Sequence, residues 1–598
     1  MPAPSPVDIS DATLRFTVKA QGSAIKDYYP VVSVSVTHEL NRISQAEIVL
    51  VDGTVEASDF PISDSSDLIP GNTIEITAGY GDDAEVSIFS GYIVRQSIRI
   101  EEGEASHLVI TCKHKAVTMC YNRKEAQFSK KTDSDIIKSI IGTYGLSCTV
   151  DATSAQQEAL FQKLSTDWDF ILSRAEYYGY VISFDGDKVI VGKPKTSGSA
   201  VLRIAFGDSL LSFKGELSAE QQPTALQVSG WDIKNQVLLN SSATEPSLNS
   251  QGTLKAKDLS GKLSQSQLNL TSNVPLAQDD LKAWADGNLL RMRLAAIRGE
   301  LTFIGNASAK PDTIIDLEGV GDRFNGSAYV SAVTHTISDG KWITGIRFGL
   351  ENKTVTERAD FGYKAAAGQL PPIMGLQVAV VKKLFEDPDS QFRILLTLPS
   401  NATNQDGLWA RVANFYATDS AGAGFLPEVG DEVIVGFLEG DPRYPVVLGS
   451  LYSSAKKAAA TPSDNNNYIK ALTTKSKLKI SFDDEKKITK IETPAGNYIT
   501  LSDDAKSIEI VDQNSNSVKM TSSGIAMQTN NDITLKATGN ITLNATGKLN
   551  LSATQDVVIS GMNVNSTAQV GFTAKGNATA EISASGQTTV KGGIVMIN

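Results

Sequence analysis

The sequence predicts a mainly β protein whose C-terminal part is a stacked β rod. Two observations lead to this prediction. Much of the chain up to residue 365 alternates apolar and polar residues between Gly and Asp turns, and residues 532–563 repeat an eight-residue unit. Alternation with a period of two is typical of strands with one buried face. A repeat this short usually indicates a solenoid or a fibre, because each unit buries its apolar face only against its neighbours.

Residues 1–365 are expected to be mostly strands, for example 31–36, 73–77 and 107–112. Helical spacing of apolar residues is rare and lies between these β segments. It predicts one helix from about Asp133 to a Gly142/Gly145 stop, a second from the Ser165-Thr166 cap to Gly179, and a third over about 278–298. The helices are therefore insertions into a β framework.

The remainder divides into four segments. Residues 366–372 end in two prolines and are expected to form a short stiff linker. Residues 373–452 are a compact block of strands, 453–476 are a polar, alanine-rich connector, and 477–598 are the rod. Strand pairs with a turn at Pro494-Ala-Gly496 are expected to lead into the eight-residue repeats, or octads.

Each octad places two apolar residues on one face of a strand and polar residues on the other. Stacking at a register of eight makes two apolar ladders, Ile533, Ile541, Leu549 and Val557 in the first and Leu535, Leu543, Leu551 and Ile559 in the second. After Asn563 the repeat loosens: Val564, Phe572 and Ile582 keep the alternation in a slipped register. A single such array exposes its edges, so we expect several identical chains wound about one axis with these ladders as the core.

Composition excludes several classes of protein. The net charge of -12 argues against nucleic acid or an anionic membrane as the main partner, because both require a basic surface. Three cysteines do not form a closed disulfide framework, the N-terminus lacks the basic and apolar regions of a signal peptide, and no apolar run is long enough to span a membrane. We expect a protein that is made and folded in a bacterial cytoplasm.

Two clusters contain residue types that occur in metal sites and catalytic sites. His107, Cys112, His114 and Cys120 have spacings that could suit zinc, but the surrounding run alternates as an ordinary strand. Glu428, Asp431 and Glu432 could mimic paired catalytic carboxylates, but they occupy a predicted turn and strand, where a solvated face is the better interpretation. We expect neither a catalytic nor a metal site, and no cofactor.

The block 373–452 contains the most specific motifs. They are Trp409-Ala-Arg-Val412, the run from Phe425 to Val433 and the run from Gly436 to Tyr452. These resemble the oligonucleotide/oligosaccharide-binding (OB) fold domain of VgrG-type spike proteins, which belong to phage baseplates and type VI secretion systems. Asp167-Trp-Asp-Phe170 with Arg174-Ala-Glu176 and Gly179 resembles the helix of that family's hub, and the segment from Asp316 to Gly321 resembles its late hub barrel.

This resemblance implies a homotrimeric spike at the tip of a contractile injection machine. Two related β-barrels in each hub region would adapt a sixfold inner tube to a threefold needle, an intertwined trimeric β-helix. Inner tube and baseplate proteins would bind the hub, and the target membrane would be contacted only when a phage tail-like particle, released or cell-bound, fires. A PAAR-type tip protein would sit on the C-terminal residues Gly592, Gly593, Ile594, Val595, Met596, Ile597 and Asn598.

Departures from the family narrow these expectations. The connector 453–476 is too short for a lysozyme domain, and the chain ends at Asn598 without a toxin domain, which favours a purely structural part. Residues 417–424 stand where many type VI relatives have a tryptophan, which favours an extracellular contractile particle or a divergent type VI system. Nucleic acid binding by the OB block is disfavoured by its five basic against ten acidic residues. The alternative is a β-solenoid polysaccharide-binding or -cleaving extracellular protein, which predicts a monomer with a ladder of carboxylates.

Overall fold

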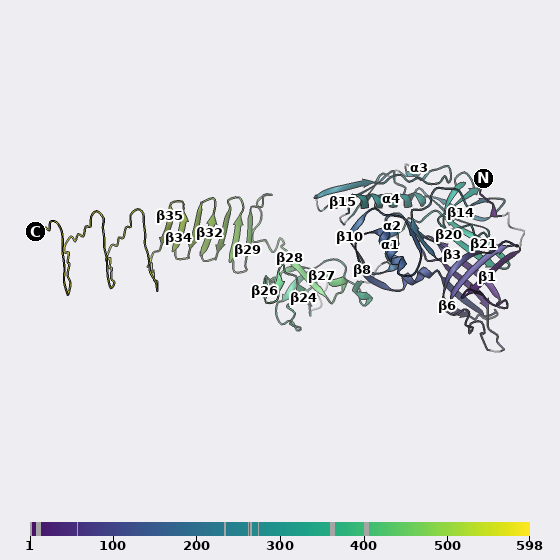
Figure 1. The fold of residues 1–598 in the computed structure, drawn as a ribbon, viewed down its shortest axis with the longest axis horizontal. Coiled ribbons are helices and arrows are strands. Elements are labelled where there is room, and N and C mark those ends of the chain that lie inside the picture. Colours follow the sequence, from purple (N-terminus) through teal and green to yellow (C-terminus); the bar gives the residue numbers. More distant parts are fainter. Residues whose placement is uncertain are drawn as a thin grey trace. The chain divides into compact units, whose positions relative to one another are not determined.

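The computed structural model of the chain describes residues 3–6, 13–56, 58–232, 235–260, 262–263, 266–272, 274, 276–358, 361, 365–399 and 406–597. The chain divides into two compact units, residues 1–451 and 452–598. The predicted mainly β architecture with few helices is confirmed (Figure 1). Among the described helices, none has the length and apolar character needed to cross a lipid bilayer.

The hub region, residues 1–365, is organised by one 13-stranded sheet with the order β14-β18-β21-β20-β3-β4-β7-β6-β5-β1-β2, to which β13 and β19 are attached. Its strands are β1 (Leu14–Ala20), β2 (Ser23–Ala24), β3 (Val31–Glu39), β4 (Gln45–Val51), β5 (Thr73–Tyr80), β6 (Val86–Arg99), β7 (His107–Lys113), β13 (Leu202–Ala205), β14 (Leu210–Leu217), β18 (Ile297–Ile304), β19 (Ile314–Glu318), β20 (Gly326–Ser338) and β21 (Lys341–Phe348). The three strands expected from the sequence are therefore present, as β3, β5 and β7.

This sheet has two halves that meet where β3 pairs with β20. The N-terminal half covers one apolar core, which includes Val34, Ile48 and Ile110, and the other half covers a second, which includes Phe303 and Val333. The resemblance implied two barrels in this region. The structure shows two cores under one continuous sheet, because β3–β20 hydrogen bonds join the halves.

Smaller elements are inserted between these strands. The first group is η2 (Lys115–Cys120), β8 (Arg123–Thr132), α1 (Asp133–Gly142), β9 (Cys148–Val150), β10 (Gln156–Thr166), α2 (Asp167–Tyr177), β11 (Val181–Asp185) and β12 (Lys188–Gly192); the second is β15 (Leu226–Asp232), β16 (Val237–Ser242), α3 (Ala256–Ser260), β17 (Leu268–Thr271) and α4 (Gln278–Leu294). All three predicted helices are confirmed, as α1, α2 and α4. The third ends earlier than expected, at Leu294, because residues from Ile297 onward pair as β18.

The predicted OB block is a closed five-stranded barrel in the order β22-β23-β24-β28-β27. Buried aliphatic side chains such as Val381, Leu396 and Val435 fill it. Its strands are β22 (Gln377–Lys383), β23 (Arg393–Thr397), β24 (Leu408–Val412), β27 (Glu432–Phe437) and β28 (Pro445–Ser450), with a small hairpin of β25 (Ala417–Thr418) and β26 (Ala421–Gly422). The 3-10 turns η4 (Ala365–Gly368) and η6 (Leu438–Gly440) lie next to it, whereas η3 (Val355–Glu357) belongs to the hub, where Val355 packs in the core around α1 and α2.

The second unit begins with a seven-stranded antiparallel sheet, called the needle sheet below. Its strands follow one another in chain order (Figure 1). They are β29 (Ile469–Thr473), β30 (Lys479–Asp483), β31 (Ile488–Glu492), β32 (Tyr498–Ser502), β33 (Ser507–Val511), β34 (Ser517–Thr521) and β35 (Gly524–Gln528). The turn expected at Pro494-Ala-Gly496 joins β31 to β32, with Gly496 at a positive φ of 96° that disfavours other residues.

Residues 529–597 continue from β35 as an extended, winding trace that forms no strand pairing with other described residues (Figure 1). Bends interrupt this trace at 538–539, 546–547, 554–555, 562, 569–570, 577–578, 585–586 and 593–594. The eight-residue spacing therefore persists well past Asn563. The expected register slip is present as well: the two units between the bends at 554–555 and 569–570 are together one residue short of two octads.

Candidate functional site

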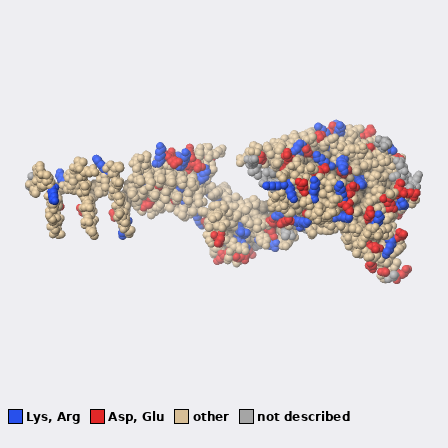
Figure 2. Space-filling view, viewed as in Figure 1, with Lys and Arg blue, Asp and Glu red and all other residues tan. Residues whose placement is uncertain are grey.

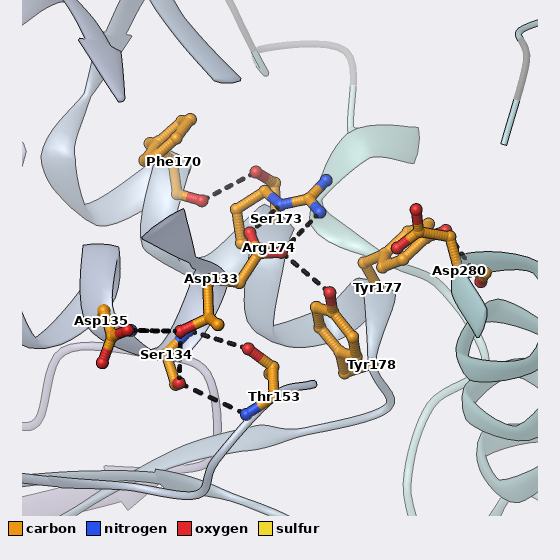
Figure 3. Close-up of polar contacts among 11 residues, drawn as sticks. Asp133, Ser134, Asp135, Thr153, Phe170, Ser173, Arg174, Tyr177, Tyr178 and Asp280 are labelled. Carbon is orange, nitrogen blue, oxygen red and sulfur yellow. Dashed lines mark hydrogen bonds and ion pairs between the residues drawn. The ribbon is translucent and has the colours of Figure 1, made fainter. Parts of the chain in front are cut away.

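Helix α2 is anchored in the hub by a buried ion pair (Figure 3). The Asp133 carboxylate, fully buried at the start of α1, accepts two hydrogen bonds from Arg174, from Nε at 2.6 Å and from Nη2 at 3.1 Å. The Tyr178 hydroxyl donates a third, at 2.8 Å. Burial and the neighbouring carboxylate raise the pKa of Tyr178 well above its ordinary value. The arrangement joins α1 to α2 rigidly, because bidentate geometry fixes both side chains.

Other polar residues of α2 contact further elements. Asp167 accepts hydrogen bonds from Lys124 at 2.6 Å, from Tyr144 at 2.6 Å and from Gln162 at 2.8 Å. Glu176 accepts one from Asn41 Nδ2 at 3.0 Å and one from the backbone N–H of Val355 at 2.6 Å, with Arg291 Nη1 at 3.8 Å. Both carboxylates accept hydrogen bonds from donors of the protein itself, as expected for side chains that stabilise the fold.

The end of α2 lies directly against α4. A Cβ added to Gly179 would lie 2.6 Å from Gly287 Cα, and one added to Gly287 would lie 2.7 Å from the Gly179 nitrogen. Gly179 also has a φ of +70°. Only glycine fits at this crossing, because the two backbones touch. The residues that carried the resemblance to a hub helix, from Asp167 to Gly179, thus tie the hub together. Sequence reasoning missed Asp133 and Gly287 as their partners, since no local pattern identifies a contact made across the fold.

The residues considered as zinc ligands have different surroundings and different partners. Cys112 is buried in the core of the first half of the sheet, Cys120 packs on the core around α1 and α2, and His114 caps η2 by accepting the backbone N–H of Ala116. Burial raises the pKa of both thiols to about 12. Among the described residues, no group of three or more His, Cys, Asp or Glu is arranged to hold a metal ion.

The acidic cluster of the barrel forms a turn. Asp431 Oδ2 accepts the backbone N–H of Glu428 at 2.9 Å, and Glu428 is exposed while Asp431 and Glu432 are half-buried. The Asp431 carboxylate therefore closes the turn before β27. The partial exposure of the cluster agrees with the expected solvated face.

The needle sheet carries one continuous apolar face. Hydrogen-bond register aligns Leu472, Ile480, Ile491, Ile499, Ile510, Val518 and Met527 in a single ladder across all seven strands. A second ladder on the same face contains Phe482, Leu501, Ile508, Met520 and Ile525. Apart from the half-buried Val518, these side chains are 37–70% exposed in the single chain. We call these two ladders the apolar face.

The opposite face of the needle sheet is polar and has its own ion pairs, within and across strands. Glu492 is 3.1 Å from Lys479 Nζ and 2.5 Å from Lys490 Nζ, and Lys519 Nζ is 3.4 Å from Glu509. The two lysines lower the pKa of Glu492. The sheet is therefore amphipathic: these charged side chains are turned away from the apolar face, and Lys470, the partner of Phe482 in the edge strand β29, stands on the apolar side.

The octads continue this exposure of apolar residues. Ile533, Leu535, Ile541, Leu543, Leu549, Leu551, Val557 and Ile559 are 54–68% exposed, and no second segment of the described chain covers them. Figure 2 shows this segment mostly in tan, with isolated charged residues. The residues expected to carry a tip protein, from Gly592 to Ile597, are exposed too, while Asn598 lies outside the described residues.

Comparisons with known proteins identify both parts of the first unit. Residues 10–339 match the family model of the Alg8 N-terminal domain, and residues 377–452 match that of the type VI secretion system/phage-baseplate injector OB domain. The first of these models alone matches more than half of the chain.

Among curated proteins, the chain is 45% identical over 56 residues to the type VI secretion system spike protein VgrG5 of Pseudomonas aeruginosa, which is 9% of this chain and 7% of the relative. It is 39% identical over 59 residues to the spike protein VgrG3 of Vibrio cholerae, or 10% of this chain and 6% of the relative. The chain thus spans less than a tenth of the length of either relative.

Among solved structures, the 43 kDa tail protein of prophage MuSo2 from Shewanella oneidensis is 11% identical, covers 57% of this chain and 99% of its own, and has a TM-score of 0.43. The OB domain model and the VgrG matches agree on one family. The chain carries the Alg8 N-terminal domain and belongs to the VgrG-type spike proteins of type VI secretion systems and phage baseplates.

Proposed function

We propose that this chain is one subunit of a homotrimeric spike in a contractile injection machine, with a mechanical role. The hub would adapt a sixfold inner tube to a threefold needle, and the needle would pierce the target envelope. The particle would be made in the bacterial cytoplasm and released or fired into a target. The observation that carries this proposal is the uncovered apolar face of the needle sheet and its continuation in the octads.

Exposing an apolar face of this length to water is unfavourable in free energy for a monomer. Twelve side chains in two ladders stand on one face of the sheet, and contiguous exposed apolar patches of this kind mark interfaces. The polar face does not have to be covered by a partner, because its carboxylates and lysines form ion pairs with each other in contact with water. Association through the apolar face is the arrangement that removes these ladders from water.

Three copies suit this geometry. Three amphipathic sheets can close as a triangular prism with all apolar faces inward and all charged faces outward. Octads that find no pairing partner in their own chain can then pair with octads of the neighbouring chains, which satisfies their backbone groups. In this assembly the ladders from Ile533 to Ile559 form the trimer core, and residues 592–598 form a threefold platform for a PAAR-type tip protein.

The second candidate, a β-solenoid polysaccharide-binding or -cleaving protein, makes a different prediction about mass. It requires a monomer, whereas the spike requires a trimer. Sedimentation equilibrium of the purified full-length chain separates the two: three times the 63.8 kDa chain mass supports the spike, and a stable monomer excludes it. A chain ending at residue 451, the boundary of the first compact unit, serves as the comparison. Trimerisation driven by the needle predicts a weaker self-association for this shorter chain.

A further inference from the structure

The small hub sheet of β15, β16 and β17 packs on α4 with one face and leaves its other face open. Leu226 and Val228 of β15 are buried in one cluster with Leu281 of α4. Because side chains alternate along a strand, the residues between them point the opposite way. Hydrogen-bond register arranges the outward residues in three rows, which are Ser242, Gln227 and Asn269; Asn240, Ser229 and Thr271; and Leu238 and Trp231. We call these eight side chains the neutral face.

The neutral face carries no charge, although 20% of the chain's residues are charged. By comparison, the solvent side of the large hub sheet has exposed charged residues such as Glu47, Glu300 and Arg347. Six of the eight side chains end in an amide or a hydroxyl group, which donates and accepts hydrogen bonds without a charge. An ionised ligand finds no counter-charge among them, so the neutral face is complementary to an uncharged polar ligand.

Trp231 supplies an open aromatic surface at one end of the neutral face. Of the five tryptophans, all within the described residues, only Trp231 is exposed, at 48%. Its cross-strand partner Leu238 is 55% exposed and extends the apolar surface. An indole ring in this position can stack against the apolar face of another ring.

Hydrogen bonds fix the direction of two amides at the other end of the neutral face. Gln267 Nε2 donates to Gln227 Oε1 at 2.9 Å and to Asn269 Oδ1 at 2.7 Å. With both oxygens engaged, the amide nitrogens of Gln227 and Asn269 are left as a neighbouring pair of donors without an acceptor in the described part of the chain. In the middle row the hydroxyls of Ser229 and Thr271 share a hydrogen bond of 3.2 Å.

The spacing of these groups suits an elongated ligand. At about 3.3 Å per residue, the stretch of β15 from Gln227 to Trp231 spans about 13 Å. A carbohydrate chain has the matching chemistry. The C–H groups of its rings form apolar patches that stack on an indole, and its hydroxyl and acetamido groups exchange hydrogen bonds with amides and hydroxyls without a charge.

We infer that the neutral face is a carbohydrate-binding site of the hub, which takes an uncharged oligosaccharide lying along β15. Trp231 stacks on one sugar ring, and Gln227 and Asn269 donate hydrogen bonds to hydroxyl or acetamido oxygens of another. The pair of carboxyl groups that glycosidic cleavage requires is absent from the eight side chains, so the site binds without cleaving. The site lies in the hub, and its test does not depend on the assembly proposed above.

The test is isothermal titration calorimetry of the full-length protein with cellotetraose and with chitotetraose, two uncharged oligosaccharides. Tetragalacturonate, which carries a carboxylate on each sugar, is the charged comparison. We expect at least one uncharged oligosaccharide to bind and the charged one to bind at least about tenfold more weakly, because its carboxylates meet no counter-charge. Absence of binding by both uncharged oligosaccharides, or equal binding of the charged one, would overturn the inference.

Variants assign the binding to the neutral face. Trp231→Ala should raise the Kd at least about tenfold through loss of the stacking surface, and Trp231→Phe should raise it less. Combined Gln227→Ala and Asn269→Ala should raise it about tenfold through loss of two hydrogen bonds. Tyr28→Ala, which removes an aromatic ring that is 72% exposed elsewhere on the hub, is the control and should leave the Kd unchanged.

Two outcomes of the variant series contradict the inference. The first is an unchanged Kd in Trp231→Ala, or in the double amide variant if Trp231→Ala does not fold. The second is a lower mass of the Trp231→Ala protein in sedimentation velocity, which would make the neutral face a contact between copies of the chain.

Discussion

Substitution of Ile499 by Asp is the sharpest test of the needle. Ile499 lies in the middle of the apolar face, directly between Ile491 and Ile510, and is 39% exposed in the single chain. In the proposed trimer the remaining exposed part becomes buried. The substitution places three carboxylates about the threefold axis, one from each chain.

The expected magnitude follows from that exposure. Full burial of an isoleucine side chain contributes about 1.5–3 kcal/mol, so covering the exposed part contributes about 1 kcal/mol per chain and about 3 kcal/mol per trimer. Burying ionised carboxylates costs several kcal/mol each, and their mutual repulsion adds to this. A total above about 6 kcal/mol lowers the association constant by about four orders of magnitude.

The assay is sedimentation velocity of the full-length protein between nanomolar and micromolar concentration. Thr500→Asp is the matched control, because Thr500 is the next residue on the same strand and faces the polar side beside Lys490 and Glu509. Ile499→Asp should dissociate at micromolar concentration and Thr500→Asp should remain trimeric. If both variants behave alike, or if Ile499→Asp is as trimeric as the wild type, the apolar face is not the interface.

Three other predictions address the hub and the octads. Asp133→Ala leaves a mostly buried guanidinium without its carboxylate and should lower the free energy of unfolding of the hub by about 3–5 kcal/mol in urea titrations, whereas Glu300→Ala, in an exposed pair, should change it by less than about 1 kcal/mol. Gly287→Ala forces a methyl group onto the Gly179 backbone and should destabilise by about 1–3 kcal/mol; a melting temperature equal to that of the wild type would contradict the contact. Leu543→Asp should disorder the octads without unfolding the hub, seen as protease cleavage confined to residues beyond 528; wild-type resistance would count against a ladder core.

Much of the fold could be predicted from sequence because the signals are local. Helix α1 begins after its Thr132 cap and α2 after its Thr166 cap, and in both helices the capping hydroxyl accepts the backbone N–H three residues on. The strand periods followed in the same way, whereas the OB barrel was expected from the resemblance of residues 373–452 to a known domain. The amphipathic character of the needle sheet has a local signal as well, since Ile499 and Leu501 alternate with polar neighbours within one strand.

The hub helix α2 shows which contacts local sequence signals do not predict. Its motif from Asp167 to Gly179 was found, yet the meaning of Arg174 depends on Asp133, forty-one residues away, and that of Gly179 on a glycine of α4. The residues of such pairs are distant in sequence and meet only in the folded chain, so a short sequence pattern does not predict the contact. The same holds for His38 and His335, which meet only because β3 pairs with β20.

The sequence by itself determined the mainly β composition, the helix positions and the eight-residue repeat, because each depends on capping, turn chemistry or periodicity within a short window; the OB barrel was implied by the resemblance of residues 373–452 to a known domain. Tertiary structure decided that the hub is one continuous sheet over two cores, that Asp133 and Arg174 join α1 to α2, and that the octad spacing persists to residue 594. It also aligned apolar residues of all seven strands into one unbroken ladder, with a second ladder beside it that Thr489 interrupts. Hairpin register sets that alignment, and register is a property of paired strands.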